Sequence, residues 1–340
     1  MGGTKKSIGV SYIINTTLVV LLFFVLLIFI NTGVIGRYNT QVLTLVCINI
    51  ILAVSLNLVT GVLGQLVLGH AGFMLVGAYA SALFTKNIGL PLSVSFPISL
   101  LLGGLLAALF GVVIGIPALR LRGDYLAIIT LGFGEIIRVV SYNLEITNGA
   151  KALSGIKSLS NRQNPSPMFI YAFLIAVFII VILFTFGRSR HGRAVISIRE
   201  DEIASESMGI NTIYYKLFVF VFAAFIAGVA GGIFAHNYGT IDPAKFDFNR
   251  SVEILIMVVL GGMGSITGSI ISAGSLTILS EKLRDFSQYR MILYSVILII
   301  VMLFRPSGLL GRYEISVPKI LRYIKKRISN KKVPPEAREE

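Results

Sequence analysis

The chain has 340 residues, of which 55% are hydrophobic and only 14% are charged, and its mean hydropathy is +0.84. About a quarter of the residues of a soluble domain are charged. The composition therefore excludes a soluble globular protein and indicates an all-α polytopic membrane protein. The net charge of +14 does not indicate nucleic-acid binding, because ten of the 30 basic residues lie between Arg305 and Arg338, after the last apolar run. A basic segment in this position is typical of a cytoplasmic tail that faces anionic membrane lipid.

Apolar runs long enough to form helices follow one another along the chain. They lie at 9–30, 41–60, 63–85, 92–116, 124–142, 168–186, 216–236, 252–263, 265–281 and 290–304. We therefore expect about ten transmembrane helices, or eight to ten, because the short pair at 252–263 and 265–281 could form one re-entrant element.

The distribution of Lys and Arg predicts the orientation. With ten spans and cytoplasmic termini, 19 basic residues fall inside and ten fall outside, as the positive-inside rule requires. We expect residues 1–35 to form an N-terminal transmembrane helix and residues 36–310 to form the main transmembrane domain. That domain contains a cytoplasmic loop at 188–215, and residues 311–340 form a basic cytoplasmic tail.

Two glycine-rich stretches interrupt the apolar pattern, at Thr60–Tyr79 and Val259–Gly274. Broken helices in the two halves of a transporter often line its pathway, but small residues also allow close helix packing. The sequence leaves both interpretations open. The candidate pathway residues are Gly64, Gly69, His70, Gly72 and Gly77 in the first stretch and Gly261, Gly262, Gly264 and Gly268 in the second.

Glu135 and Arg138 are charged residues within one apolar run, and their spacing of three places them on one face of a helix. An ionisable residue inside a membrane is by default a candidate functional residue. We favour a mutually neutralised pair that fixes helix packing. Apart from Glu135, the spans hold almost no acidic residues, which argues against transport driven by an ion gradient.

Motifs of catalysis, nucleotide binding and metal binding are absent from the sequence. The nearest match to a P-loop, Gly264 to Ser269, lacks the lysine. The three histidines lack ligand spacing, and the single cysteine, Cys47, can form no intrachain disulfide. We therefore expect a protein that is not an enzyme, with no catalytic residues and no metal or cofactor bound by this chain.

The stretch from Gly192 to Asn211 carries six charges within an otherwise apolar chain. The predicted orientation places it in the cytoplasm. Its composition predicts a short helix ending near Gly209, with Glu202 and Glu206 on one face and Ile196, Ile203 and Ile210 marking another. Such a helix could dock into a groove of a partner, or the stretch could be a solvated loop that only orients the protein.

Four stretches in combination resemble the permeases of branched-chain amino-acid ABC importers, and of their two homologous permease subunits the M-type. They are LNLVTGVLGQLVLGHAGFMLVGAYASAL, LRLRGDYLAIITLGFGEIIR, EILIMVVLGGMGSITG and the segment that begins GRAVISIREDEIASESMGIN. The resemblance covers roughly 50 to 310. It departs from the usual family pattern at Thr147-Asn148-Gly149, where a Thr-Gly-Gly sequence is usual.

The resemblance implies partners and a mechanism. A second permease completes the pathway, two ATPase subunits bind ATP and dock on the cytoplasmic loops, and an extracytoplasmic binding protein delivers the substrate. The permease domain is then 36–310, in a prokaryotic plasma membrane, and its loop 188–215 carries a coupling helix at Arg199–Gly209. The coupling residues implied are Arg199, Glu200, Asp201, Glu202, Ala204, Glu206 and Gly209.

Three alternatives stay open from the sequence. Related permeases carry urea or short amides, so the substrate could be of that kind. A gradient-driven secondary transporter that acts alone, and a membrane scaffold or enzyme subunit, are functions of different classes. We expect the double substitution Glu202→Lys with Glu206→Lys to leave insertion intact and to uncouple ATP hydrolysis from uptake.

Overall fold

The computed structural model describes residues 3–121, 123–160, 164–284, 289–305 and 308–311. The predicted tail at 311–340 lies outside these ranges except for Gly311. The chain divides into two compact units, one of Met1–Ile35 with Tyr313–Glu340 and one of Gly36–Arg312. Within the described part of the first unit there is one helix, α1 (Gly3–Asn31).

The larger unit is almost entirely helical. Its α-helices are α2 (Arg37–Asn57), α3 (His70–Asn87), α4 (Leu92–Ala118), α5 (Asp124–Asn143), α6 (Ser166–Arg188), α7 (Arg190–Glu200), α8 (Glu202–Ser207), α9 (Thr212–Tyr238), α10 (Phe248–Gly261), α11 (Ile266–Lys282) and α12 (Arg290–Phe304). Shorter elements are the π-helix η1 (Leu58–Leu63), the 3-10 turns η2 (Glu145–Thr147), η3 (Gly149–Lys151) and η4 (Pro243–Phe246), and the strands β1 (Leu153–Ser154) and β2 (Thr240–Ile241). The strands pair in antiparallel fashion, with Leu153 opposite Ile241.

Each apolar run of the sequence falls on a helix, but one boundary differs from the expected one. The run at 63–85 becomes α3, which begins only at His70. Before it, α2 continues through η1 and ends at Gly64, whose φ of +80° is left-handed. This conformation favours glycine and stops the helix. The pair at 252–263 and 265–281 forms two helices, α10 and α11.

Five helical segments in the described residues are at least 18 residues long and apolar enough to cross a membrane. They are Arg37–Leu63, Leu92–Ala118, Asp124–Asn143, Ser166–Arg188 and Thr212–Tyr238. The chain is therefore an all-α, multi-pass membrane protein.

The core of the larger unit is the packing of α3, α4 and α9, which contact one another more extensively than any other helices. Glycines permit this close approach. A Cβ built at Gly77 of α3 would lie 2.1 Å from the carbonyl oxygen of Gly228 in α9, and one at Gly231 would lie 1.9 Å from that of Met74. Such small-residue contacts are typical of helix association in a bilayer, where apolar burial provides little driving force.

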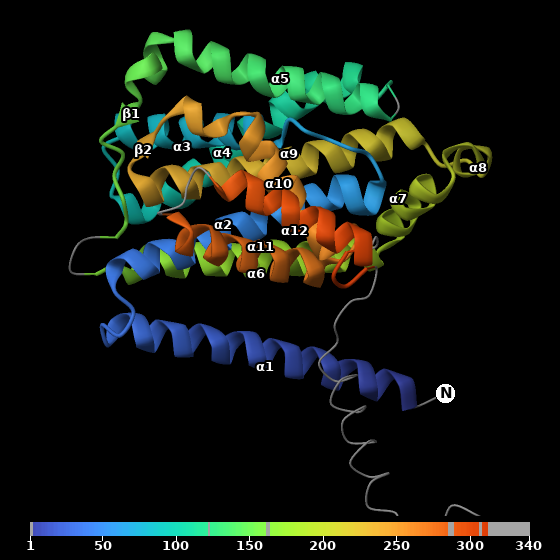
Figure 1. Ribbon diagram of the computed structural model, residues 1–340, viewed down its shortest axis with the longest axis horizontal. Coiled ribbons are helices and arrows are strands. Elements are labelled where there is room, and N and C mark those ends of the chain that lie inside the picture. The colour runs from blue at the N-terminus through green and yellow to red at the C-terminus, as the bar shows by residue number, and fades with distance from the viewer. Residues whose placement is uncertain (1–2, 122, 161–163, 285–288, 306–307, 312–340) are drawn as a thin grey trace, which may run out of the picture. The chain divides into compact units, whose positions relative to one another are not determined.

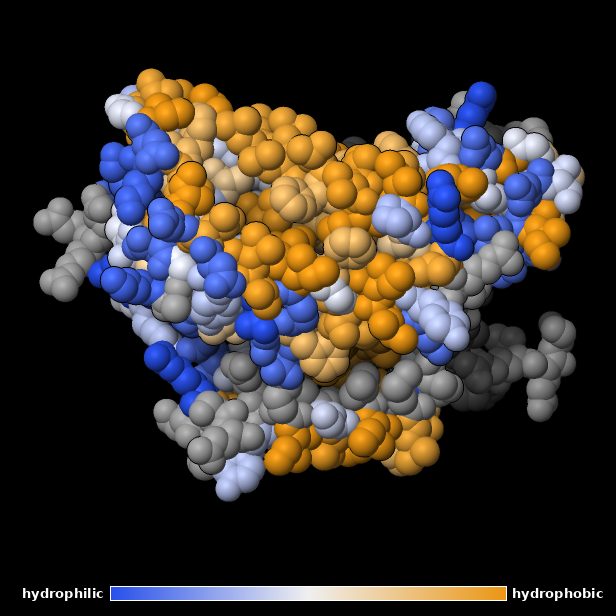
Figure 2. Space-filling view, turned by 90° about the horizontal axis from the view of Figure 1, so that it is seen from above, coloured by the Kyte–Doolittle hydropathy of each residue, from blue (hydrophilic) through white to orange (hydrophobic). Residues whose placement is uncertain are grey.

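The outer faces of the larger unit expose large apolar side chains. On α4, Leu101, Leu105, Leu109 and Val113 are all exposed and repeat every four residues. Figure 2 shows that apolar side chains form a band between hydrophilic residues at two ends of the molecule. Such a surface is incompatible with water and suits lipid. Helices α7 and α8 lie at one end of the larger unit, and β1 and β2 lie at the other (Figure 1).

Candidate functional site

Helix α7 begins the charged stretch and packs against α6, η1 and α9. The Ser189 hydroxyl caps the helix by accepting a hydrogen bond from the backbone N–H of Gly192 at 3.0 Å. Val195 and Ile198, three residues apart, are buried. This inward face was not predicted from the sequence, although Val195 and Ile198 have the spacing of residues on one face of a helix. The first half of the charged stretch is therefore held against the transmembrane helices.

The structure corrects the expected single helix at Arg199–Gly209. Arg199 and Glu200 belong to the end of α7, and α8 is a separate helix of six residues. The division occurs at Asp201, whose backbone is extended, with φ −155° and ψ 111°. Its carboxylate accepts a hydrogen bond from the backbone N–H of Ala204 at 3.0 Å and so caps α8. An aspartate that caps a new helix cannot also continue the preceding one.

This division also changes the expected faces of the charged stretch. Ile196 lies on α7, Ile203 lies on α8 and Ile210 follows α8, so the three isoleucines do not form one helical face. The chain turns after α8 at Gly209, whose φ of +82° is left-handed.

The two predicted coupling glutamates differ in their surroundings. Glu202 forms an ion pair with Lys216 of α9, with 2.6 Å between Oε1 and Nζ. The Lys216 side chain is only 4% exposed. Glu206 is exposed. Loss of the Glu202 charge would leave a buried ammonium uncompensated, so Glu202 supports the position of α8 against α9.

Large apolar side chains are also exposed on α8, on the turn that follows it and at the start of α9. Ile203 is 69% exposed, Met208 is 83% exposed and Ile213 is 72% exposed. We call Ile203, Glu206 and Met208 the α8 surface. Exposed apolar side chains that lie close together in this way are typical of contacts with another protein or with a membrane.

Arg199 connects α7 to both glycine-rich stretches. Its Nη1 donates a hydrogen bond to the carbonyl oxygen of Gly61 in η1. Ideal Cβ atoms would lie 2.8 Å from Arg199 Cγ at Gly64 and 3.1 Å from Nη1 at Gly264. Both glycines have left-handed φ angles, +80° and +96°. The arginine side chain therefore occupies a space that only glycines leave open.

The two glycine-rich stretches meet at Asn57, the last residue of α2. The side-chain oxygen of Asn57 accepts from the backbone N–H of Gly264 at 2.8 Å, and its Nδ2 donates to the carbonyl oxygen of Ser265 at 3.0 Å. Asn57 is 1% exposed. A buried amide within an apolar run is the signal that could have identified it from the sequence.

Most other glycines singled out in the sequence mark close backbone contacts. A Cβ at Gly69 would lie 2.1 Å from the carbonyl oxygen of Thr130, and one at Gly72 would lie 2.9 Å from the Cα of Gly134. Gly261 of α10 and Gly268 of α11 approach each other in the same way. These contacts agree with the packing interpretation. The backbone of Gly262, with φ +112°, belongs to the turn between the two helices.

His70 opens α3 and is buried. Its Nε2 lies 2.7 Å from the Ser55 hydroxyl oxygen. This contact ties the start of α3 to α2.

Glu135 and Arg138 of α5 form an ion pair, with 2.6 Å between Oε2 and Nη2. The Arg138 side chain is 26% exposed and that of Glu135 is 33% exposed. The guanidinium also lies over the ring of Tyr142, 5.9 Å from its centre. These contacts all join residues of α5.

A cavity of about 550 Å³ lies between α2, α9, α10 and α11. It is on the opposite side of the larger unit from α8, because its walls include Phe234 and Tyr238 at the end of α9, whereas Lys216 near the start of α9 pairs with α8. Its charged lining residues are Lys245, Asp247, Arg250, Glu253 and Glu281.

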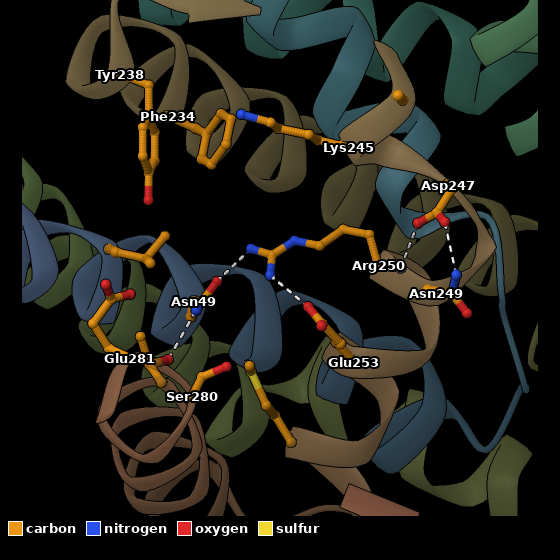
Figure 3. Close-up of a pocket in the computed structure, with 14 residues that line it drawn as sticks. Asn49, Phe234, Tyr238, Lys245, Asp247, Asn249, Arg250, Glu253, Ser280 and Glu281 are labelled. Carbon is orange, nitrogen blue, oxygen red and sulfur yellow. Dashed lines mark hydrogen bonds and ion pairs between the residues drawn. The ribbon is translucent and has the colours of Figure 1, made fainter. Parts of the chain in front are cut away.

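Arg250 occupies the centre of this cavity in Figure 3, between Asn49 and Glu253. Its Nη2 donates to Asn49 Oδ1 at 2.6 Å, and its Nη1 pairs with Glu253 Oε2 at 3.0 Å. Asn49 Nδ2 in turn donates to the Thr277 hydroxyl at 2.8 Å. This network joins α10, α2 and α11. The sequence gave no sign that Asn49 joins Arg250 and Glu253.

No group of three or more His, Cys, Asp or Glu side chains that could hold a metal ion occurs among the described residues. Cys47 is a buried free thiol.

Comparison with known proteins gives one family over most of the chain. The family model described as "Branched-chain amino acid transport system / permease component" matches residues 38–304. The high-affinity branched-chain amino acid transport system permease protein LivM of Escherichia coli K12 is 38% identical over 304 residues, which cover 81% of this chain and 71% of the relative.

Two further relatives extend this comparison. The LivM protein of Salmonella typhimurium LT2 is 39% identical over 266 residues, which cover 70% of this chain and 62% of that protein. The permease protein LivH of Escherichia coli K12 is 35% identical over 131 residues, 38% of this chain and 42% of the relative. No solved structure matches the chain.

Proposed function

Because this chain belongs to the family of branched-chain amino acid transport permeases, we propose that it is the transmembrane permease subunit of an ATP-driven importer of branched-chain, hydrophobic amino acids. The match at residues 38–304, which runs from α2 to α12, carries this proposal. The translocation path re-orients by alternating access.

The partners of the proposed importer are a homologous second permease, two cytoplasmic ABC ATPases that bind ATP, and an extracytoplasmic amino-acid-binding protein. Similarity of the chain to both LivM and LivH relatives supports the pairing of two homologous permeases. The membrane is a prokaryotic plasma membrane, with about ten spans, cytoplasmic termini and the α7–α8 end in the cytoplasm. The excess of Lys and Arg in the segments assigned to the cytoplasm supports this orientation.

We assign coupling to the α7–α8 segment. The exposed α8 surface docks on an ATPase subunit, and Glu202 with Lys216 holds α8 against α9. Arg199 connects the same segment to Gly61 in η1 and lies against Gly264. A push on α8 therefore reaches the point where both broken helices meet.

The double substitution Ile203→Asp with Met208→Asp tests this assignment. Both side chains are more than two-thirds exposed, so the permease should still fold and insert. We expect the ATPase subunits to co-purify with the variant at least tenfold less, and leucine uptake to fall accordingly. The conservative pair Ile203→Val with Met208→Leu keeps the apolar surface and should behave like the parent. Normal assembly and uptake in the aspartate variant would contradict the coupling role.

The substitution pair suggested by the sequence is less suitable, because Glu202→Lys would place a second cation beside the buried Lys216. Such a variant could fail by unfolding. Glu206→Lys alone changes an exposed residue and is the informative charge reversal.

A further inference from the structure

We propose that the cavity between α2, α9, α10 and α11 binds the zwitterion of a free hydrophobic amino acid through the Arg250 network and its apolar wall. The cavity has a volume of about 550 Å³, within the range of roughly 300–1,000 Å³ that small-molecule sites occupy. This inference rests on the proposed function and names a substrate site within it.

Charges of both signs line the cavity. Lys245 and Arg250 supply cations, and Asp247, Glu253 and Glu281 supply carboxylates. An amino acid carries one carboxylate and one ammonium a few atoms apart, so it can satisfy a cation and an anion of one cavity together. A carboxylate offers about four acceptor positions, so Glu253 and Glu281 can accept from a ligand ammonium in addition to their contacts with Arg250, Tyr38 and Arg284. A ligand with only one of the two charges would lose one of these two sets of charge-assisted hydrogen bonds.

Arg250 is held in place before any ligand enters. Its contacts with Glu253 at 3.0 Å and Asn49 at 2.6 Å fix the guanidinium, and Asn49 is fixed by Thr277. A guanidinium has five N–H donors, and these contacts occupy two of them. The fixed group can therefore also receive a carboxylate, which forms strong charge-assisted hydrogen bonds with arginine.

The wall beside these charges is apolar. Leu45, Phe234 and Met257 line the cavity with the exposed Tyr238 at its margin. Lys245 extends toward Phe234 in Figure 3, so a cation and an aromatic ring face the same space. The apolar wall suits the side chain of a hydrophobic amino acid, and the charges of both signs suit its ammonium and carboxylate groups.

The position of the cavity along α9 suits the entry of substrate. Lys216, which pairs with α8, and Tyr238, which lines the cavity, lie at opposite ends of this helix. Their separation along the axis is about 30 Å at 1.5 Å per residue. The cavity therefore lies on the side away from the α8 surface, where the proposed binding protein releases its ligand.

The Arg250 network could instead serve only to tie three helices together, so the test measures ligand chemistry. The full importer complex, without binding protein or nucleotide, is titrated with labelled leucine, with leucinol, which lacks the carboxylate, and with 4-methylpentanoate, which lacks the ammonium. We expect leucine to bind at least tenfold more tightly than either analogue. Equal binding of leucinol would overturn the proposal.

Variants then locate the binding. Arg250→Gln with Glu253→Gln removes both charges at similar side-chain size and should weaken leucine binding at least tenfold. The matched control is Glu135→Gln with Arg138→Gln, a pair of the same composition and spacing on α5, which should bind leucine like the parent. Unchanged leucine affinity in the Arg250/Glu253 variant would contradict the site.

A second variant covers the case in which the buried double variant fails to assemble. Lys245 is exposed, so Lys245→Gln should fold, and we expect at least threefold weaker leucine binding. Lys282→Gln, an exposed lysine of α11 outside the cavity lining, is its control. Equal affinities for these two variants would refute the role of the cavity.

The result that would refute the proposed importer function differs from the result that would refute only the binding site. A parent complex that imports no leucine, isoleucine or valine with ATP and binding protein would refute importer function itself. A parent complex that imports them while the cavity variants bind leucine normally would refute only the site.

Discussion

The two arginine–glutamate pairs on α5 and α10 have the same residue types and the same spacing, but their surroundings differ. Glu135 and Arg138 are 33% and 26% exposed, and the pair contacts Tyr142 of its own helix. Arg250 and Glu253 are 15% and 10% exposed, and Arg250 also bonds Asn49 of another helix. Spacing alone therefore does not distinguish a local pair from one that joins helices. Burial and a third partner distinguish them.

The largest effect should follow from Arg250→Gln alone. It removes the ion-pair partner of Glu253, whose side chain is 10% exposed, and breaking a buried ion pair by removing one partner typically costs about 3–5 kcal/mol. Thermal unfolding of the purified protein should show a marked loss of stability and less assembled complex. The double variant with Glu253→Gln should recover part of this loss. A single variant as stable as the parent would show that the α10 pair resembles the α5 pair.

A smaller effect is expected for Asn49→Leu. The substitution removes the partner of both Arg250 Nη2 and the Thr277 hydroxyl, and an unsatisfied buried polar group costs about 1–3 kcal/mol. The free energy of unfolding should fall by that amount. In a double-mutant cycle with Arg250→Gln the two effects should not add, because both belong to one network. Additive effects would separate Asn49 from Arg250.

The smallest effect is expected for Glu135→Gln with Arg138→Gln. The pair is partly exposed, and pairs of this kind contribute roughly 0–1 kcal/mol. Unfolding and leucine uptake should both stay close to the parent. If this variant folds normally but loses uptake, the α5 pair has a transport role and the contrast between the two pairs fails.

The helices themselves could be predicted from the sequence with few errors. Every apolar run became a helix, because a chain in a bilayer must satisfy its backbone hydrogen bonds within each segment. The start of α3 was misplaced because the residues from Gly64 to Gly69 are nearly as apolar as a helix. The glycine-rich pattern indicated a break within Thr60–Tyr79, but only the left-handed Gly64 and the contact of Gly69 with Thr130 show where the helices end and begin.

The charged stretch was predicted as one helix and is two. Helix-forming composition extends through Asp201, and only the local choice between continuing α7 and capping α8 decides its conformation. The inward face of α7, with Val195 and Ile198, depends on the helices against which it packs. Likewise, Glu202 and Glu206 look equivalent in sequence, and the buried Lys216 makes them different.

The sequence by itself determined the membrane character, the helices and the family resemblance, because hydropathy, glycine content and motifs are local properties. The tertiary structure alone decided which distant residues meet. Asn57 joins the two glycine-rich stretches, Arg199 joins α7 to them, and Asn49 joins Arg250 to Thr277. These contacts join residues far apart in the chain, and the packing of the helices fixes their partners.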